Sequence, residues 1–201
     1  MRKLLVFVAV VAVALVGLAG QSRAGGIGLY AEGASGSGDF EYEPFGSFDV
    51  DAESKGFGLV LDTNLSDRGL FNYRLNVGYE QLTLPDDFGT DLELDGGVVA
   101  SSFGFALLRR ADLRWWAGPQ LKLGLFDGSL NTNTSGDYKL VSVGAGLVTG
   151  VNVVGENMTF SASVGVMLNS YVGETNEYGP VQDINADTTT GFLNLAVLFG
   201  R

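Results

Sequence analysis

Apolar and polar side chains alternate strictly along the segment from Phe71 to Glu80, where each large apolar residue is followed by a polar or very small one. A β-strand places successive side chains on opposite faces, so this segment predicts a strand with one apolar and one polar face. About ten residues is also the length that a tilted strand needs to cross the hydrocarbon core of a bilayer. The segment therefore predicts a membrane-spanning strand.

Segments of this kind recur along the chain and give eight predicted strands. They are Ile27–Ser37, Lys55–Thr63, Leu70–Thr83, Leu92–Leu108, Asp112–Phe126, Tyr138–Val154, Met158–Tyr171 and Thr189–Phe199. Eight is the smallest even number of strands that closes a transmembrane barrel. The predicted fold is all-β: an eight-stranded antiparallel up-and-down transmembrane β-barrel.

The connections between these strands alternate in length. The short ones are Asn64–Gly69, Arg109–Ala111 and Gly155–Asn157, and the long ones are Gly38–Ser54, Leu84–Asp91, Asp127–Asp137 and Val172–Thr188. Outer-membrane barrels have this asymmetry, with tight periplasmic turns and longer external loops. The alternation therefore favours a membrane barrel over a soluble one.

The composition of the polar face indicates which side of the sheet is enclosed. In a soluble barrel that face meets water and carries many Lys, Glu and Arg residues, whereas here it is mostly Gly, Ser, Thr, Asn and Ala. Small residues suit a crowded interior, so we expect the bulky apolar face to contact lipid. On the fifth strand, this places Leu121 and Leu123 outside and Gln120 and Lys122 inside.

Two places depart from the regular pattern. In the fourth strand, Leu92 and Leu94 have the opposite parity to Phe103 and Phe105, which predicts a β-bulge at Gly96-Gly97 that shifts the register. In the fifth strand, Pro119 cannot donate a ladder hydrogen bond and predicts a local irregularity. The eighth strand is apolar on both faces, and we assign one set to lipid: Leu193, Leu195, Val197 and Phe199.

The N-terminus has the features of a cleaved export signal. Arg2 and Lys3 precede an apolar stretch from Leu4 to Leu18, and small residues follow at Ser22-Arg23-Ala24. The alternative is a membrane anchor, for which the stretch is short. We therefore predict a signal peptide over residues 1–24 and one barrel domain over residues 25–201.

Charge and cysteine content narrow the class further. Cleavage after residue 24 would leave 9 of the 12 basic residues against all 23 acidic ones, so the net charge becomes 9 − 23 = −14. A chain this acidic is not expected to bind nucleic acid. It has no cysteine, so stability must come from something other than disulfides, and closure of a sheet within a membrane would provide it.

These strands together with the aromatic C-terminal segment Phe192–Phe199 resemble the small outer-membrane β-barrel superfamily, which includes the OmpA barrel domain, OmpX, OmpW and the opacity proteins. The segment looks like the signal that such proteins present to the barrel-assembly machinery, although Gly200 and Arg201 follow it here. The resemblance implies the outer membrane of a Gram-negative bacterium, with lipid and lipopolysaccharide around the barrel.

Catalysis is not expected. The chain has no histidine, and resemblance to the enzymes among membrane barrels would imply one at the active site. No cofactor, catalytic residue or metal ligand is predicted.

Six charged residues fall on the predicted inner face. Three are acids and three are bases, and they could neutralise one another in a narrow lumen: Glu32, Asp62, Glu80, Arg74, Arg114 and Lys122. One interpretation is a gate whose ion pairs rearrange to pass solutes. We favour the other, a polar plug, because an eight-stranded barrel is only just wide enough for its own side chains.

The predicted external loops are acidic, most of all in the first. One interpretation is that they bind divalent cations that bridge to lipopolysaccharide. Asp49-x-Asp51-x-Glu53 is similar in spacing to a calcium-binding loop, but Ser54 and Val60 stand where an EF-hand needs glycine and glutamate. We therefore favour a solvated, repulsive surface.

Aromatic residues near strand ends predict girdles at the two membrane interfaces, a simpler account than ligand stacking. They are Tyr30, Phe57, Phe71, Tyr79, Trp115, Tyr138 and Phe199.

The sequence thus predicts an outer-membrane barrel with a structural or surface-interaction role, and the partner of its loops is left open. The first alternative is a transport protein of the OmpW kind that passes small apolar solutes through the barrel wall or lumen. The second is a soluble, lipocalin-like periplasmic binder with its apolar face turned inward.

Overall fold

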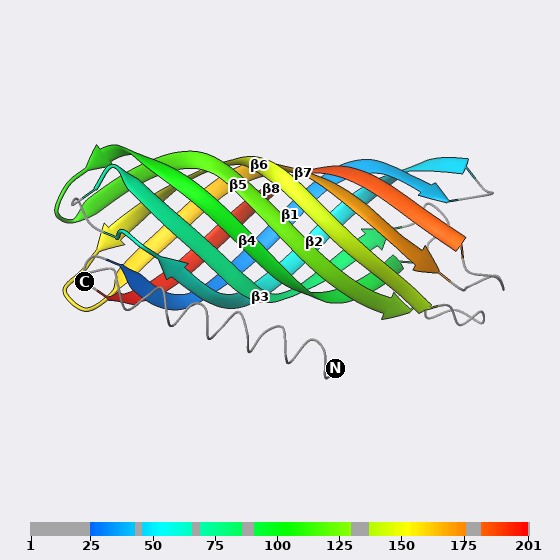
Figure 1. Ribbon diagram of the computed structural model, residues 1–201, viewed down its shortest axis with the longest axis horizontal. Coiled ribbons are helices and arrows are strands. Elements are labelled where there is room, and N and C mark those ends of the chain that lie inside the picture. The colour runs from blue at the N-terminus through cyan, green and yellow to red at the C-terminus, as the bar shows by residue number, and fades with distance from the viewer. Residues whose placement is uncertain are drawn as a thin grey trace.

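The chain folds as one closed sheet. The computed structural model describes residues 25–42, 46–65, 69–85, 91–129, 137–175 and 182–200. Its strands are β1 Gly26–Tyr42, β2 Gly46–Asp62, β3 Phe71–Pro85, β4 Asp91–Arg109, β5 Leu113–Ser129, β6 Asp137–Val154, β7 Thr159–Thr175 and β8 Gln182–Gly200. Each strand pairs antiparallel with the next, and β8 pairs with β1 (Figure 1). The predicted eight-stranded up-and-down barrel is confirmed.

The predicted signal peptide, residues 1–24, lies outside the described residues. Within the described part of the chain, no helix is both long enough and apolar enough to cross a membrane.

The register of the ladders sets the tilt of the strands. Following paired residues once around the barrel from Gly26 leads back to β1 at Gly36, ten residues further along. The route passes through Asp62, Arg74, Ser102, Gln120, Gly146, Met167 and Thr190. A stagger of this kind requires strands tilted by about 35–45° to the barrel axis.

Large apolar side chains face outward over the half of the barrel that contains the short turns. They include Ile27, Leu29, Phe57, Leu59, Phe103, Phe105, Leu121, Leu123, Val143, Val164, Leu193 and Leu195, all exposed. Their neighbours along each strand point inward and are mostly small or polar. The predicted orientation is therefore confirmed for this half, and we call this outer surface the apolar band.

The strands extend well beyond the predicted bounds at the opposite end. The expected loop Gly38–Ser54 is almost entirely strand, because β1 continues to Tyr42 and β2 begins at Gly46. The expected loop Val172–Thr188 shortens in the same way to residues 176–181. The prediction of long external loops was thus largely wrong: the acidic residues that the structure describes in these segments lie on paired strands that reach past the apolar band.

In β4, the change of parity occurs without a bulge at Gly96-Gly97. Both residues keep an unbroken register with β3 and with β5, so the predicted bulge is wrong. Leu94 is fully buried inside the barrel, whereas Phe105 on the other parity is 46% exposed on the outside. The strand is regular, and what differs between its two ends is the environment that each face meets.

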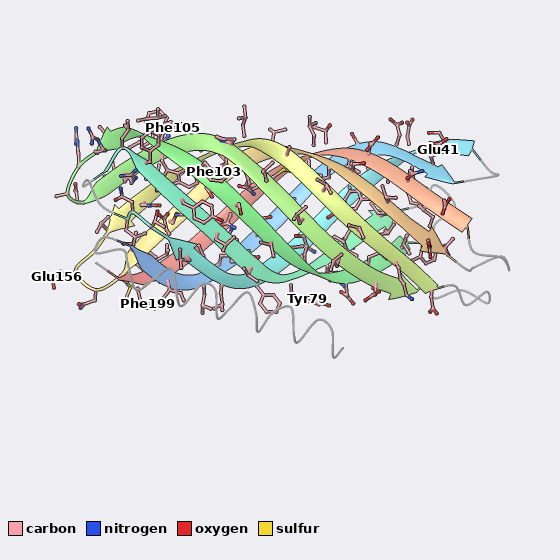
Figure 2. The ribbon with its side chains drawn as sticks, in the orientation of Figure 1. Glu41, Tyr79, Phe103, Phe105, Glu156 and Phe199 are labelled. Atoms are coloured by element: carbon pink, nitrogen blue, oxygen red, sulfur yellow. The ribbon has the colours of Figure 1, made fainter. Side chains whose placement is uncertain are left out.

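The same exchange of apolar and polar faces, which we call the inversion, occurs around the whole loop end. Acidic side chains face outward there, and we call them the acidic collar: Asp39, Glu41, Asp49, Asp51, Glu53, Glu93, Asp95, Asp127, Asp137, Glu174, Asp183 and Asp187. Twelve apolar side chains face inward, and we call them the loop-end core: Ala52, Leu82, Leu84, Leu92, Leu94, Val98, Phe126, Tyr138, Leu140, Tyr171, Ile184 and Ala186. This end is thus organised like a water-soluble barrel. Figure 2 shows Phe105 and Phe199 projecting near the short-turn end and Glu41 near the other.

The ladder between β4 and β5 has two irregularities. Ser102 pairs with Gln120 and Phe105 pairs with Ala117, but the intervening residues of β5, which include Pro119, are not paired with β4. A register shift follows between Ala106 and Leu108. The irregularity expected at Pro119 is present, and the bulge lies at the short-turn end of β4.

Glycines on the inner wall make room for large interior side chains. A Cβ atom on Gly78 would lie 2.5 Å from the Tyr30 hydroxyl, and one on Gly150 would lie 2.8 Å from the Trp116 ring. A narrow barrel can hold aromatic rings only where small residues face them. Tyr30 therefore lies inside, as does Tyr138, and neither belongs to the girdle predicted for them.

Single-cysteine labelling of β4 tests the inversion, since the chain has no native cysteine. We compare Asp95→Cys, Leu94→Cys and Phe103→Cys in lipid vesicles with a membrane-impermeant maleimide, following the mass increase over time. Only Asp95→Cys is expected to label quickly, because Asp95 faces outward beyond the apolar band, Leu94 lies in the loop-end core and Phe103 lies in the band.

All three variants should label at similar rates after unfolding, which controls for thiol reactivity. Fast labelling of Leu94→Cys together with protection of Asp95→Cys would contradict the regular register and indicate a bulge.

Candidate functional site

The six charged residues singled out in the sequence all lie at inward positions of the barrel. Glu32 comes from β1, Asp62 from β2, Arg74 and Glu80 from β3, and Arg114 and Lys122 from β5. The structure brings them together as two separate ion-pair groups, with Arg114 bound elsewhere.

The first group is centred on Arg74. Its Nε and Nη2 atoms lie 3.0 and 2.9 Å from Asp62 Oδ2, and Asp62 is its direct partner on the neighbouring strand. Nη2 also donates to Asn152 Oδ1 at 3.0 Å and to Ser161 Oγ at 2.9 Å, across the lumen on β6 and β7. The guanidinium lies 4.9 Å from the centre of the Trp116 ring, within the range of a cation–π contact. Arg74 thus connects four strands and contacts a fifth.

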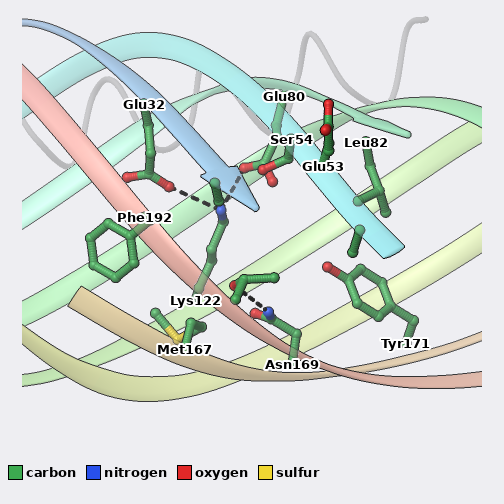
Figure 3. Close-up of a pocket in the computed structure, with 13 residues that line it drawn as sticks. Glu32, Glu53, Ser54, Glu80, Leu82, Lys122, Met167, Asn169, Tyr171 and Phe192 are labelled. Carbon is green, nitrogen blue, oxygen red and sulfur yellow. Dashed lines mark hydrogen bonds and ion pairs between the residues drawn. The ribbon is translucent and has the colours of Figure 1, made fainter. Parts of the chain in front are cut away.

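The second group is centred on Lys122. Its Nζ atom lies 3.1 Å from Glu32 Oε1 and 2.6 Å from Glu80 Oε2 (Figure 3). Asn194 Nδ2 donates to the other Glu32 oxygen at 2.9 Å. One ammonium group therefore holds two carboxylates from β1 and β3, so this group has a net negative charge. All three charged side chains are almost completely enclosed.

Arg114 closes the short-turn end. Its side chain is fully buried and donates to the carbonyl oxygens of Gly69 at 2.8 Å and Leu70 at 3.3 Å. These carbonyls belong to the β2–β3 connection, which also turns Leu65 into the barrel against Tyr30 and Leu198. Arg114 thus holds Gly69 and Leu70 in place at this end of the barrel.

Three polar partners in these groups were not singled out from the sequence: Asn152, Ser161 and Asn194. Asn152 Oδ1 accepts from Arg74, Trp116 and Ser161, so one acceptor is shared by donors from three strands. Their inward parity was visible in the sequence, but nothing there indicated which strands face each other across the lumen.

The space left between these side chains is small. A cavity of about 10 Å³ adjoins Lys122, about one water-sized site, lined by residues that include Glu80, Asn169, Tyr171 and Phe192. Figure 3 shows these side chains around it. Among the described residues, no group of three or more Asp, Glu, His or Cys side chains is placed to hold a metal ion. The chemistry of the site is therefore that of hydrogen bonds and ion pairs that tie opposite walls of the barrel together.

A double-mutant cycle tests the Arg74 group. Arg74→Met leaves the Asp62 carboxylate buried without its guanidinium partner, so we expect the free energy of unfolding to fall by about 3–5 kcal/mol. Adding Asp62→Asn removes the isolated charge and should recover part of this loss. Urea unfolding in lipid vesicles, followed on gels by the change in mobility of the folded barrel, provides the measurement.

Lys55→Met is the matched control, because Lys55 is an exposed base on β2, and we expect a change within about 0.5 kcal/mol. A loss in Arg74→Met no larger than in this control would show that the Arg74 group does not stabilise the barrel.

Comparison with known proteins gives a likeness of fold. No protein-family model and no curated protein matches the chain. Among solved structures, the outer membrane protein OprG from Pseudomonas aeruginosa matches 90% of this chain and 98% of its own, with a TM-score of 0.62 and 14% identity. Neisserial surface protein A matches 83% of this chain and 95% of its own, with a TM-score of 0.39 and 15% identity. Taken with the closed, eight-stranded sheet, the likeness to OprG identifies the fold of this chain as that of the small outer-membrane β-barrels.

Proposed function

We propose that this protein is an integral barrel of the outer membrane of a Gram-negative bacterium, with a structural or surface-interaction role and a plugged lumen. The apolar band supports the membrane location, because its exposed Leu, Val and Phe side chains would be costly in water and suit lipid. Export by a cleaved signal over residues 1–24 and insertion by the barrel-assembly machinery are parts of the same proposal.

The observation that supports the plugged lumen is the series of buried side-chain groups at successive heights along it. From the short turns upward lie Leu65 with Tyr30, the Arg74 group with Trp116, the Lys122 group, and the loop-end core. Beside Lys122 there is room for about one water-sized group. Such packing supports a structural element rather than a channel.

Transport of apolar solutes through the lumen is less well supported. A solute would need a continuous apolar path, but the apolar clusters at the two ends are separated by the buried charges of Arg74 and Lys122. Moving an apolar solute past them would break buried ion pairs, which is costly. The likeness to OprG is one of fold alone and assigns no role to this chain.

A soluble, lipocalin-like binder is also less well supported. Such a barrel encloses an apolar cavity and presents a polar surface to water. Here the apolar band faces outward, and the lumen beside it holds Arg74, Arg114 and Lys122.

We propose no catalytic role, since the chain has no histidine and its enclosed carboxylates are held by Arg74 and Lys122. The acidic collar is proposed to face the exterior, next to the lipopolysaccharide headgroups. We propose that this solvated, mutually repulsive surface serves interaction with other molecules.

Fractionation with gel mobility tests the membrane barrel. We expect the protein in the detergent-extracted outer membrane, and we expect unheated samples to migrate differently from boiled ones, because a closed barrel resists unfolding by detergent. External protease should cut only near the loop end. Recovery from the soluble periplasm without detergent would contradict the proposal.

Single-channel recording in planar bilayers tests the plug. We expect no resolved conductance steps from the wild type, from Arg114→Ala or from Arg110→Ala. Arg114→Ala loosens only the short-turn end, whereas Trp116 and the Lys122 group still fill the lumen above it. Arg110 is the matched control, an exposed arginine of the β4–β5 turn.

Regular steps from the wild type would support a transport role and contradict the plug. Steps from Arg114→Ala alone would show that the lumen is closed by a single gate rather than filled along its length.

A further inference from the structure

The apolar band does not reach the same height on all sides of the barrel. In the ring of eight strands, β1 lies opposite β5 and β2 lies opposite β6 (Figure 1). Eight steps between paired residues climb ten residues toward the loop end, so three steps climb about four residues (3 × 10/8 = 3.75). Residues on the two opposite walls can therefore be compared at equal heights.

Apolar residues on one wall are level with polar residues on the other. Three steps upward from Val141 on β6 lead to β1 four residues above Ser37, so these two residues are level. Three steps downward from Leu123 on β5 lead to β2 four residues below Lys55, so these two are level as well. All four side chains are exposed on the outer face. Two more level pairs follow in the same way: Val143 with Ser35, and Leu125 with Glu53.

The band is therefore thicker over β5 and β6 than over β1 and β2. On β6 it runs from Val153 to Val141, which is roughly 30 Å along the axis for strands tilted by about 40°. The lower edges of the two walls agree, because Ile27 on β1 is level with Val151 on β6. The difference lies at the upper edge, where apolar residues on β5 and β6 reach roughly 10 Å higher. Tilting the whole barrel would have displaced both edges.

Small and polar residues replace the band at these heights on β8, β1 and β2. A Cβ atom on Gly33 would lie 4.0 Å from its nearest neighbour and one on Gly191 would lie 3.9 Å away, so this outer surface is open. Among the described residues of β1, β2, β3 and β8, Lys55 is the one base that faces outward, and no described residue forms an ion pair with it. The full set is Gly33, Ser35, Ser37, Lys55, Thr189 and Gly191.

A level membrane boundary cannot suit both walls. If hydrocarbon covered Leu123 and Val141, a boundary at the same height on β2 would place Lys55 in hydrocarbon, where a charged side chain is costly. If the boundary lay below Lys55 on every side, the apolar residues of β5 and β6 above it would face water. A boundary that lies lower on the β8–β1–β2 wall avoids both costs.

Charge favours lipid headgroups over a second copy of the chain as the cover of this wall. A two-fold dimer would bring Asp39, Asp49 and Asp51 of both copies together, and like charges repel. An anionic phosphate instead matches Lys55, and the hydroxyl of Ser35 can donate to it. Phosphate beside Lys55 lies below the acidic collar, whose lowest member on β2 is Glu53.

We propose that the outer-leaflet boundary is oblique, roughly 10 Å lower on the β8–β1–β2 wall than on β5 and β6, so that phosphorylated headgroups of outer-leaflet lipid rest on this wall with a phosphate beside Lys55. This inference names the headgroup partner of the proposed outer-membrane barrel and rests on that proposal.

Cysteine labelling at level positions tests the oblique boundary, because the chain has no native cysteine. Ser37→Cys and Val141→Cys are compared in lipid vesicles with a membrane-impermeant maleimide, and Ser35→Cys and Val143→Cys form a second pair. We expect the cysteine on β1 to label about tenfold faster in each pair, because the reagent needs water and hydrocarbon excludes it. Equal rates after unfolding control for thiol reactivity.

Lipid A binding to the full barrel in detergent micelles tests the role of Lys55. Native mass spectrometry measures how much phosphorylated lipid A is retained, with dephosphorylated lipid A as the comparison. We expect Lys55→Gln to weaken retention of the phosphorylated form by about fivefold and to leave the dephosphorylated form unchanged, because one attraction to an anionic headgroup is lost.

Lys139→Gln is the matched control for this substitution. Lys139 is an exposed base on β6, and its direct partners on the neighbouring strands are Asp127 and Glu174. We expect less than about a twofold change, since these acids already offset its charge. Gel mobility confirms that every variant is a folded barrel.

Four results would overturn the inference. They are equal labelling within both cysteine pairs, equal losses in Lys55→Gln and Lys139→Gln, displacement of lipid A by an equal concentration of inorganic phosphate, and a disulfide-linked dimer of Ser35→Cys. Each would leave the barrel itself unchallenged, since fractionation and conductance test that separately.

Discussion

The closed sheet of this protein meets two different surroundings along its length, and this constraint organises the rest of the structure. Over the half with the short turns, the outer face is apolar and the lumen holds the buried charges; near the loop end, the outer face is acidic and the lumen is apolar. The strands pass through the change without losing register, as Gly96 and Gly97 show. The inversion therefore comes from a change of solvent around a continuous sheet, since each end places its apolar side chains where water is absent.

Closure with eight strands imposes the second constraint, which is volume. The interior is just wide enough for side chains, so large and small residues must face each other. Trp116 packs over glycines of two other strands, Gly104 and Gly150, and Tyr30 lies against Gly78. The abundance of glycine thus serves packing, and it allows aromatic rings to fill the lumen where a larger barrel would have water.

Buried charges in the polar half tie the walls together. Arg74 reaches Asp62 on the adjacent strand and Asn152 and Ser161 on the far wall, so a single side chain spans the lumen. Lys122 does the same between Glu32 and Glu80. Because these charges are held by ion pairs and hydrogen bonds among buried side chains, we propose that the contacts that stabilise the barrel also oppose passage through it. On this proposal, interaction with other molecules is left to the exterior.

The sequence by itself determined the number of strands, their up-and-down order, the outward direction of the apolar face over the short-turn half and the inward parity of the six charged residues, because alternation with a period of two is local to each strand. It did not determine that Leu92 and Leu94 point inward without a bulge, since a change of parity looks the same whether the register or the solvent changes. Tyr30 and Tyr138 were wrongly predicted to lie in the girdles, because nothing local to a strand tells which parity meets lipid at each height. Only the tertiary structure decided that Arg74 pairs with Asp62 while Lys122 takes both Glu32 and Glu80. Those pairings depend on the stagger of the strands around the closed barrel, which sets the residues that share a height in the lumen.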